Sequence, residues 1–271
     1  MMEFFNAVYA VELVVLFALL GGLYLGVEKN ESMTTEIEFD VNDPSIGSEY
    51  LTDEFPNGEA LPSVLTTLIL VLVPVFLSLM MKKEKRTAQH LYHILLGCLF
   101  ILSVGKILIS PMKVGLGQLR PDFLGRCEPE WNNVTMAMEC TGDPKVVQKG
   151  RCSFPSGHAQ MAWGIGVFIL FWIDEFYINA QLYEKDEKEG GNSTKGRVLQ
   201  VVILLLVPFG ISLQRLLQNK HHPRDVAAGA VWGIICAMMG WRWCFVRDGD
   251  YKWVIRPRGE AAEGGAKVAV Q

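Results

Sequence analysis

Three short stretches of the chain combine side chains that bind phosphate with histidines that can react with it. They are residues 113–121 (KVGLGQLRP), 154–158 (FPSGH) and 214–225 (QRLLQNKHHPRD). Lysine offers a point charge and arginine a forked pair of donors, and both suit a dianionic phosphoryl group. Together the three stretches predict a site for a phosphomonoester.

Five residues in these stretches are expected to hold the phosphate oxygens: Lys113, Arg120, Ser156, Gly157 and Arg215. Ser156 and Gly157 precede an apolar run, so their N–H groups point outward from the start of a helix. Simpler interpretations exist, because Lys113 and Arg120 also suit solvated positions at a membrane surface and Pro-Ser-Gly also suits an ordinary helix cap. Arg215 is harder to explain in this way, since an ionisable residue inside an apolar run is usually functional or paired.

The histidines and one aspartate supply the reactive groups. His221 and Asp225 are four residues apart, so in the first turn of a helix Asp225 would orient one ring nitrogen and leave the other as a nucleophile. His158 is then free to give a proton to the departing alkoxide. Pro223 suits a helix start. His222 stays open as an alternative nucleophile, because residues three apart on a helix also touch.

A metal site is the main chemical alternative for this cluster. Such a site needs two to four convergent carboxylate, histidine or cysteine ligands. The cluster is instead rich in lysine and arginine, which repel a cation, so we expect no metal and no other cofactor. The net charge of −4 and the lack of a basic stripe also argue against a nucleic-acid partner.

The elements that position these stretches are long apolar runs. An apolar run of about 18 residues or more can cross a bilayer as a helix, since a helix satisfies its own backbone polar groups. Six runs qualify: 4–27, 61–81, 91–110, 159–180, 198–217 and 226–246. The first lacks a basic leading region, so we expect a retained span rather than a signal peptide. The predicted fold is an all-α polytopic membrane protein with six transmembrane helices.

The loop charges predict the orientation of these helices. Basic residues gather in the short loop 82–90 and in the tail 247–271, which marks both as cytosolic. Loop 28–60 carries ten Asp or Glu and one basic residue, and it faces outward together with loop 111–158. All three phosphate-binding stretches then lie at the lumenal or extracellular face.

Glycosylation sequons and cysteines bear on the same question. The sequons at Asn30 and Asn133 fall on the predicted outer side, but the one at Asn192 falls on the cytosolic side. An oxidising compartment permits one disulfide among the three cysteines of the outer loop, and the sequence does not choose the partners. These three are Cys127, Cys140 and Cys152.

The patterns Lys-x6-Arg-Pro, Pro-Ser-Gly-His and Arg-x5-His-x3-Asp resemble the three signatures of the type 2 phosphatidic acid phosphatase superfamily. Residues 119–127 (LRPDFLGRC), 140–143 (CTGD) and the paired His221 and His222 look like its lipid phosphate phosphatase branch. The resemblance covers about residues 60–246 and leaves out the termini and the acidic loop. One departure is Gln214, which stands where the family usually has serine before the arginine; we expect altered affinity or selectivity and retained chemistry.

The resemblance implies that His221 forms a phosphohistidine, that Asp225 orients it, and that His158 is the general acid. It places the remaining candidates around the phosphate: Lys113, Arg120, Ser156, Gly157 and Arg215. The expected function is metal-independent hydrolysis of a lipid phosphate such as phosphatidate, lysophosphatidate, diacylglycerol pyrophosphate or a sphingoid phosphate. The rival functions are a phosphotransferase or haloperoxidase with the same pocket, and a catalytically weak or inactive membrane binder or transporter of anionic lipids.

The expected organisation has three parts. Residues 1–60 hold the first span and the acidic loop, residues 61–246 form the phosphatase core, and residues 247–271 are a basic cytosolic tail. The expected location is an endomembrane or the plasma membrane, with lipid substrate reaching the site from the outer leaflet. The sequence leaves the preferred lipid, the organelle and the oligomeric state open, a homo-oligomer included.

Overall fold

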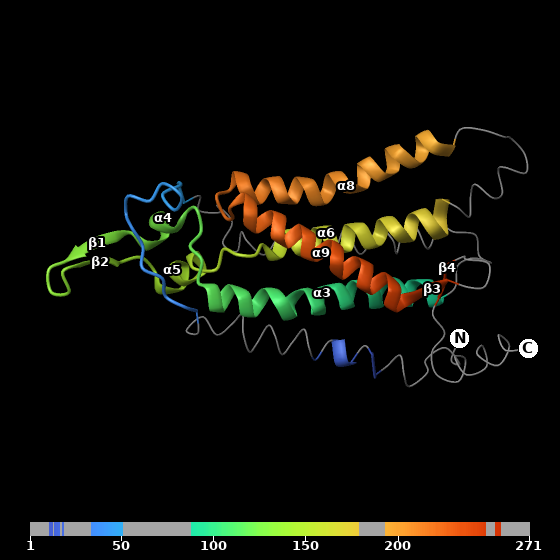
Figure 1. Cartoon of the computed structure of the whole chain (residues 1–271), viewed down its shortest axis with the longest axis horizontal. Helices are drawn as coiled ribbons and strands as arrows, with labels where there is room; N and C mark the ends of the chain where they lie inside the picture. Colours follow the sequence, from blue (N-terminus) through green and yellow to red (C-terminus); the bar gives the residue numbers. More distant parts are fainter. Residues whose placement is uncertain are drawn as a thin grey trace, which may run out of the picture.

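The computed structural model describes residues 11–12, 14–16, 18, 34–50, 88–178, 193–247 and 253–255, and these are mostly helical. Four long helices run along the molecule, and a small group of short elements lies at one end of them (Figure 1). The long helices are α3 (Ala88–Leu116), α6 (Gly157–Trp172), α8 (Ser193–Leu217) and α9 (Pro223–Cys244). A π-helical turn, η4 (Ile173–Ile178), continues α6.

Two helices within the described residues are long and apolar enough to cross a membrane. They span Leu91–Leu116 in α3 and Pro223–Cys244 in α9, and a shorter apolar segment covers Leu205–Leu217. The predicted runs 91–110, 159–180, 198–217 and 226–246 correspond to α3, α6 with η4, α8 and α9. Run 61–81 and most of run 4–27 lie outside the described residues. The mostly helical fold is confirmed, and six spans stay a prediction.

Two glycines of α9 allow it to pack closely against α6. A Cβ atom at Gly229 of α9 would lie 2.3 Å from the Ser156 carbonyl, and one at Gly233 would lie 2.3 Å from the Gln160 carbonyl. The two glycines are four residues apart and face α6, the spacing that lets membrane helices approach backbone to backbone. This contact fixes the start of α6, with Ser156, against the first turns of α9.

An aromatic core lies at the end of the bundle away from the short elements. The Trp241 ring lies 4.3 Å from that of Phe245 and meets that of Phe168 edge to face at 5.9 Å, measured between ring centroids. Phe168 and Phe245 are fully buried, together with Trp172. The chain then forms a hairpin of β3 (Phe245–Arg247) and β4 (Trp253–Ile255), which the all-helical prediction did not include.

The short elements form a polar cap at the other end (Figure 1). They are α4 (Phe123–Cys127), a hairpin of β1 (Pro129–Asn132) and β2 (Ala137–Cys140), and α5 (Pro144–Gly150). The structure shows which of the three outer-loop cysteines pair, because a disulfide joins Cys127 to Cys140. Asn133 lies exposed in the turn between β1 and β2, while Asn30 and Asn192 lie outside the described residues.

Candidate active site

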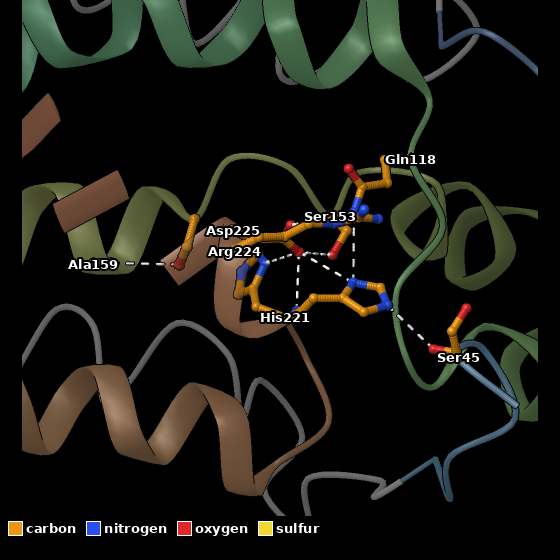
Figure 2. Close-up of polar contacts among 9 residues, drawn as sticks. Ser45, Gln118, Ser153, Ala159, His221, Arg224 and Asp225 are labelled. Atoms are coloured by element: carbon orange, nitrogen blue, oxygen red, sulfur yellow. Dashed lines mark hydrogen bonds and ion pairs between the residues drawn. The ribbon is translucent and has the colours of Figure 1, made fainter. Parts of the chain in front are cut away.

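The three phosphate-binding stretches meet where the helices end beside the cap. The Ser153 hydroxyl, just before stretch 154–158, donates to Asp225 Oδ2 at 2.6 Å, and Gln118 Nε2 in stretch 113–121 donates to Asp225 Oδ1 at 3.2 Å (Figure 2). Backbone bonds fix the same arrangement, because Ser156 N donates to the Asp225 carbonyl at 3.0 Å and Ser153 N donates to the Gln118 carbonyl at 2.9 Å. Asp225 is therefore the residue on which all three stretches converge.

The start of α9 determines where its polar residues point. Pro223 occupies the first helical position, where the missing N–H of proline costs nothing. His222 is the N-cap, and its backbone N–H donates to Asp225 Oδ2 at 3.0 Å. Pro223 thus leaves His221 one residue before the cap, outside the first turn where the sequence had suggested it would lie.

His221 is 3% exposed, and its burial favours a neutral imidazole. Burial lowers its pKa to about 3; the nearby Asp225 carboxylate acts in the opposite direction, and the charges of Arg120 and Lys113 lower it further. Its Nδ1 lies 3.8 Å from Asp225 Oδ2, which is beyond hydrogen-bond distance. Catalytic hydrogen bonds are often long without substrate and shorten in the complex. A neutral ring with one nitrogen toward a carboxylate keeps the other nitrogen available for attack.

His222 has a different environment although it is the next residue. Its Nδ1 lies 3.3 Å from Asp225 Oδ2, and its Nε2 lies 3.1 Å from the carbonyl oxygen of Ser45. Both ring nitrogens therefore face acceptors, and an imidazole satisfies two acceptors only when both nitrogens carry protons. The hydrogen bond to Asp225 is the main cause of its raised pKa. A protonated His222 has no lone pair for attack, which disfavours it as the alternative nucleophile.

The predicted cations come from the ends of α3 and α8 and from the loop after α3. Arg120 and Arg215 are buried, Arg215 in the last turn of α8, where its guanidinium donates to the side chain of Gln218. Lys113 lies in the last turn of α3, and its charge reaches His221. Gln214, the departure from the family pattern, is half-buried beside Arg215.

The start of α6 supplies backbone donors. Ser156 is its N-cap and accepts from the N–H of Ala159 at 3.4 Å, while Gly157 and His158 form the first turn. N–H groups in a first turn have no acceptor within the helix, so they are suited to bind an anion. A Cβ atom at Gly157 would meet no described atom within 4 Å, which leaves space beside these donors. His158 is half-buried there.

Three groups around the site were not predicted from the sequence. Gln118 and Ser153 bond Asp225, and the Ser45 carbonyl bonds His222. Gln118 lies inside the first motif between its lysine and arginine, which was a usable signal. Ser153 fits no motif, and a backbone carbonyl such as that of Ser45 leaves no trace in the sequence.

Among the described residues, metal ligands do not gather at this end of the molecule. In the part of the chain that the structure describes, no group of three or more His, Cys, Asp or Glu side chains is placed to hold a metal ion. Metal independence itself stays a prediction, which rests on the chemistry of the cationic cluster.

Comparison with known proteins identifies the family. The model of the PAP2 superfamily matches residues 92–248, which is more than half of the chain and includes all three stretches. The chain belongs to the PAP2 superfamily. This confirms the resemblance stated from the motifs.

Individual relatives point to the same branch. Lipid phosphate phosphatase 2 of Arabidopsis thaliana is 32% identical over 200 residues, which cover 71% of this chain and 65% of the relative. Probable lipid phosphate phosphatase 4 of the same plant is 31% identical over 71% of this chain and 61% of the relative. Probable diacylglycerol pyrophosphate phosphatase 1 of Schizosaccharomyces pombe is 28% identical over 72% and 69%. The chain thus covers less than two thirds of both plant relatives. No solved structure matches it.

Proposed function

We propose that the protein hydrolyses lipid phosphomonoesters through a phosphohistidine at His221. The observation that carries this proposal is the neutral, buried His221 beside Asp225, within range of the charges of Arg120 and Lys113. Relatives that are lipid phosphate phosphatases by name support the substrate class.

The reaction takes two steps. In the first, the His221 nitrogen that faces away from Asp225 attacks phosphorus while the bond from phosphorus to the lipid oxygen breaks. His158 gives its proton to the departing alkoxide, so the products are a free lipid alcohol and a phosphohistidine. In the second, water attacks phosphorus while the bond from phosphorus to His221 breaks. The water gives a proton to His158, which lost its own in the first step, and inorganic phosphate leaves.

The cations and backbone donors stabilise the charge that develops on the phosphoryl oxygens. Lys113, Arg120 and Arg215 supply positive charge, and the N–H groups that begin α6 at Gly157 supply oriented donors. Donors fixed in advance in a water-poor site are worth more than the same donors in water, because they need no reorganisation. This arrangement needs no metal ion to neutralise the phosphate.

The membrane placement belongs to the same proposal. Six helices cross the bilayer, and the site faces the lumen or the exterior. The apolar surface of α8 supports this, because Leu206, Phe209, Leu213 and Leu217 are all exposed. Large exposed apolar side chains along one helix suit contact with acyl chains. The lipid's tails then stay in the outer leaflet while its headgroup enters the site.

Phosphate release from a lipid panel tests the proposal. Purified protein in detergent micelles is offered phosphatidate, lysophosphatidate, diacylglycerol pyrophosphate and a sphingoid phosphate, each with excess EDTA and no magnesium. We expect release from at least one lipid, undiminished by EDTA and absent in His221→Ala. Retained lipid binding without release would instead indicate a binder, and turnover that returned only with magnesium would overturn the metal-free mechanism.

A further inference from the structure

Residues 34–50, here called the outer strap, pass across the polar cap and contact the first phosphate-binding stretch. Thr35 N donates to the Val114 carbonyl at 2.9 Å, and Ser48 N donates to the Pro121 carbonyl at 2.8 Å. Gly117 lets the strap approach closely, because a Cβ atom there would lie 2.1 Å from the Thr35 carbonyl oxygen. The backbone of the strap is therefore fixed beside residues 113–121 at both of its ends.

The strap is also bound to the third stretch. His222 Nε2 donates to the Ser45 carbonyl at 3.1 Å, and Asn219 Nδ2 donates to the Glu49 carbonyl at 3.2 Å. Figure 2 shows Ser45 at the edge of the group that contains Asp225 and His221. One histidine thus joins the strap to the carboxylate at the centre of the site.

The charges around His222 favour its protonated form. On its own helix it faces Asp225, with Arg224 as the opposing charge, and the strap presents Asp43. Stretch 113–121 presents the uncharged amide of Gln118, whose Nε2 lies 3.5 Å from Nδ1. This donor opposes a proton on Nδ1, but it has a nearer acceptor in Asp225 Oδ1 at 3.2 Å. The strap holds five acidic residues and no basic one, so its field also favours a cation at this position. On deprotonation the ring keeps one proton and satisfies only one of its two acceptors.

We propose that protonated His222 is a positioning residue of this site, and that through it the outer strap becomes a fourth part of the catalytic machinery. The proposal rests on the proposed function at His221. By bonding Oδ2 of Asp225 and the Ser45 carbonyl together, His222 holds the carboxylate where it faces His221. Its action goes through Asp225, so it affects the chemical step and leaves phosphate binding to the cations.

The kinetic test compares wild type with His222→Gln over pH 5.5–9.5 in the same detergent and lipid. A hydrogen bond to a charged group is worth about 1.5–3 kcal/mol, so kcat of the variant should fall on the order of 10- to 100-fold at neutral pH. KM should stay within about threefold, because the phosphate ligands are intact. The wild type should lose kcat as pH rises through the raised pKa of His222. Because loss of the His158 proton lowers kcat in both proteins, the ratio of wild-type to variant kcat isolates the effect of His222, and this ratio should fall at alkaline pH.

Asn219→Gly is the matched control. Asn219 has a φ of 54°, which glycine adopts easily, so the variant removes only the other side-chain hydrogen bond from stretch 214–225 to the strap. It should keep the alkaline decline of the wild type. A His222→Gln profile with the wild-type shape, or a loss confined to KM, would overturn the positioning role.

Hydrogen exchange separates this proposal from the proposed function, because it needs no turnover. At pH 6, His222→Gln should lose protection in the peptide that contains the Ser48 amide and keep it in the peptide that contains Thr35. The difference from wild type should shrink as pH rises through the raised pKa of His222. Equal protection of Ser48 in both proteins would contradict the strap contact. If the two proteins differ in Ser48 protection but the wild type has no phosphatase activity, only the proposed function is contradicted.

Discussion

The two ends of the helical bundle bury opposite kinds of side chain. At one end Phe168, Trp241 and Phe245 form an aromatic core, in which the two phenylalanines carry no polar side-chain atoms. At the other end charged side chains are buried at similar depth, among them Arg120, Arg215 and Asp225. Burying a charge is costly unless it is paired or hydrogen-bonded, so the polar end has to be built as a network.

That network includes a second cluster beside the site. Arg126 donates to both oxygens of Asp122 at 2.8 Å, and Lys220 Nζ lies 3.3 Å from the same carboxylate. Both cations also lie over the ring of Tyr50. Lys220 precedes His221 and Asp122 follows shortly after Arg120, so the cluster ties two phosphate-binding stretches together. We therefore expect substitutions at the apolar end to act mainly on stability and substitutions at the polar end to act mainly on activity.

Removing the proposed general acid should give the largest change, and only in activity. His158→Ala should slow hydrolysis of phosphatidate by about 10²–10⁴-fold, because a lipid alkoxide leaves poorly without a proton. An aryl phosphate with a nitrophenolate leaving group needs little protonation, so its defect should be much smaller. Rapid-quench measurement of the first phosphoryl transfer with both substrates checks this. Equal defects would remove His158 from the leaving-group role.

A change in the aromatic end should affect stability and leave the chemistry intact. Phe168 is fully buried and packs on Gly97 of α3, so Phe168→Ala should lower the free energy of unfolding by about 3–5 kcal/mol. Thermal unfolding in detergent measures the loss, with the exposed Val231→Ala as the control. The folded fraction of Phe168→Ala should keep the wild-type kcat; a large loss of kcat there would break the division between the two ends.

Acid should destabilise the polar end through His221. Its pKa is about 3 in the folded protein and about 6.5 in an unfolded chain, so the unfolded chain binds more protons between these values. The stabilisation is fully present above pH 6.5 and is lost as pH falls toward 3, by at most about 1.4 kcal/mol per pH unit. Melting temperatures from pH 7 to pH 4 should therefore fall more steeply for wild type than for His221→Gln. Parallel slopes would show that the ring is not held neutral.

The smallest expected effect concerns the side of the membrane that the polar end faces. In a eukaryotic host we expect a glycan on Asn133, which lies exposed in the β1–β2 turn. An endoglycosidase should shift the wild-type band on a gel and leave Asn133→Gln unshifted, with activity unchanged because the turn projects away from the site. Protease cleavage of loop 82–90 from the outer side only would reverse the proposed orientation.

The sequence predicted the parts of this molecule that rest on side-chain type and spacing. The apolar runs gave the positions of α3, α6, α8 and α9, and Pro223 marked the start of α9. The motifs indicated three stretches that the structure brings together around Asp225. These features were predictable because they depend only on residue types and on short spacings along the chain.

Contacts that depend on the path of the chain were not predictable. The partner of Cys127 was open among three cysteines until the β1–β2 hairpin placed Cys140 beside it. The bond from His222 to the Ser45 carbonyl joins residues far apart in sequence through a backbone atom, which any residue type supplies. Spacing favoured His221 as the partner of Asp225, whereas the structure gives the hydrogen bond to His222 because that residue caps α9.

Mapping the phosphorylated residue tests the account most directly. Phosphatidate labelled in its phosphate is mixed with enzyme, the reaction is quenched in base within milliseconds, and the labelled peptide is sequenced. We expect a base-stable label on His221, absent in His221→Gln and present in His222→Gln. A label on His222, or a labelled phosphoenzyme in His221→Gln, would contradict this expectation.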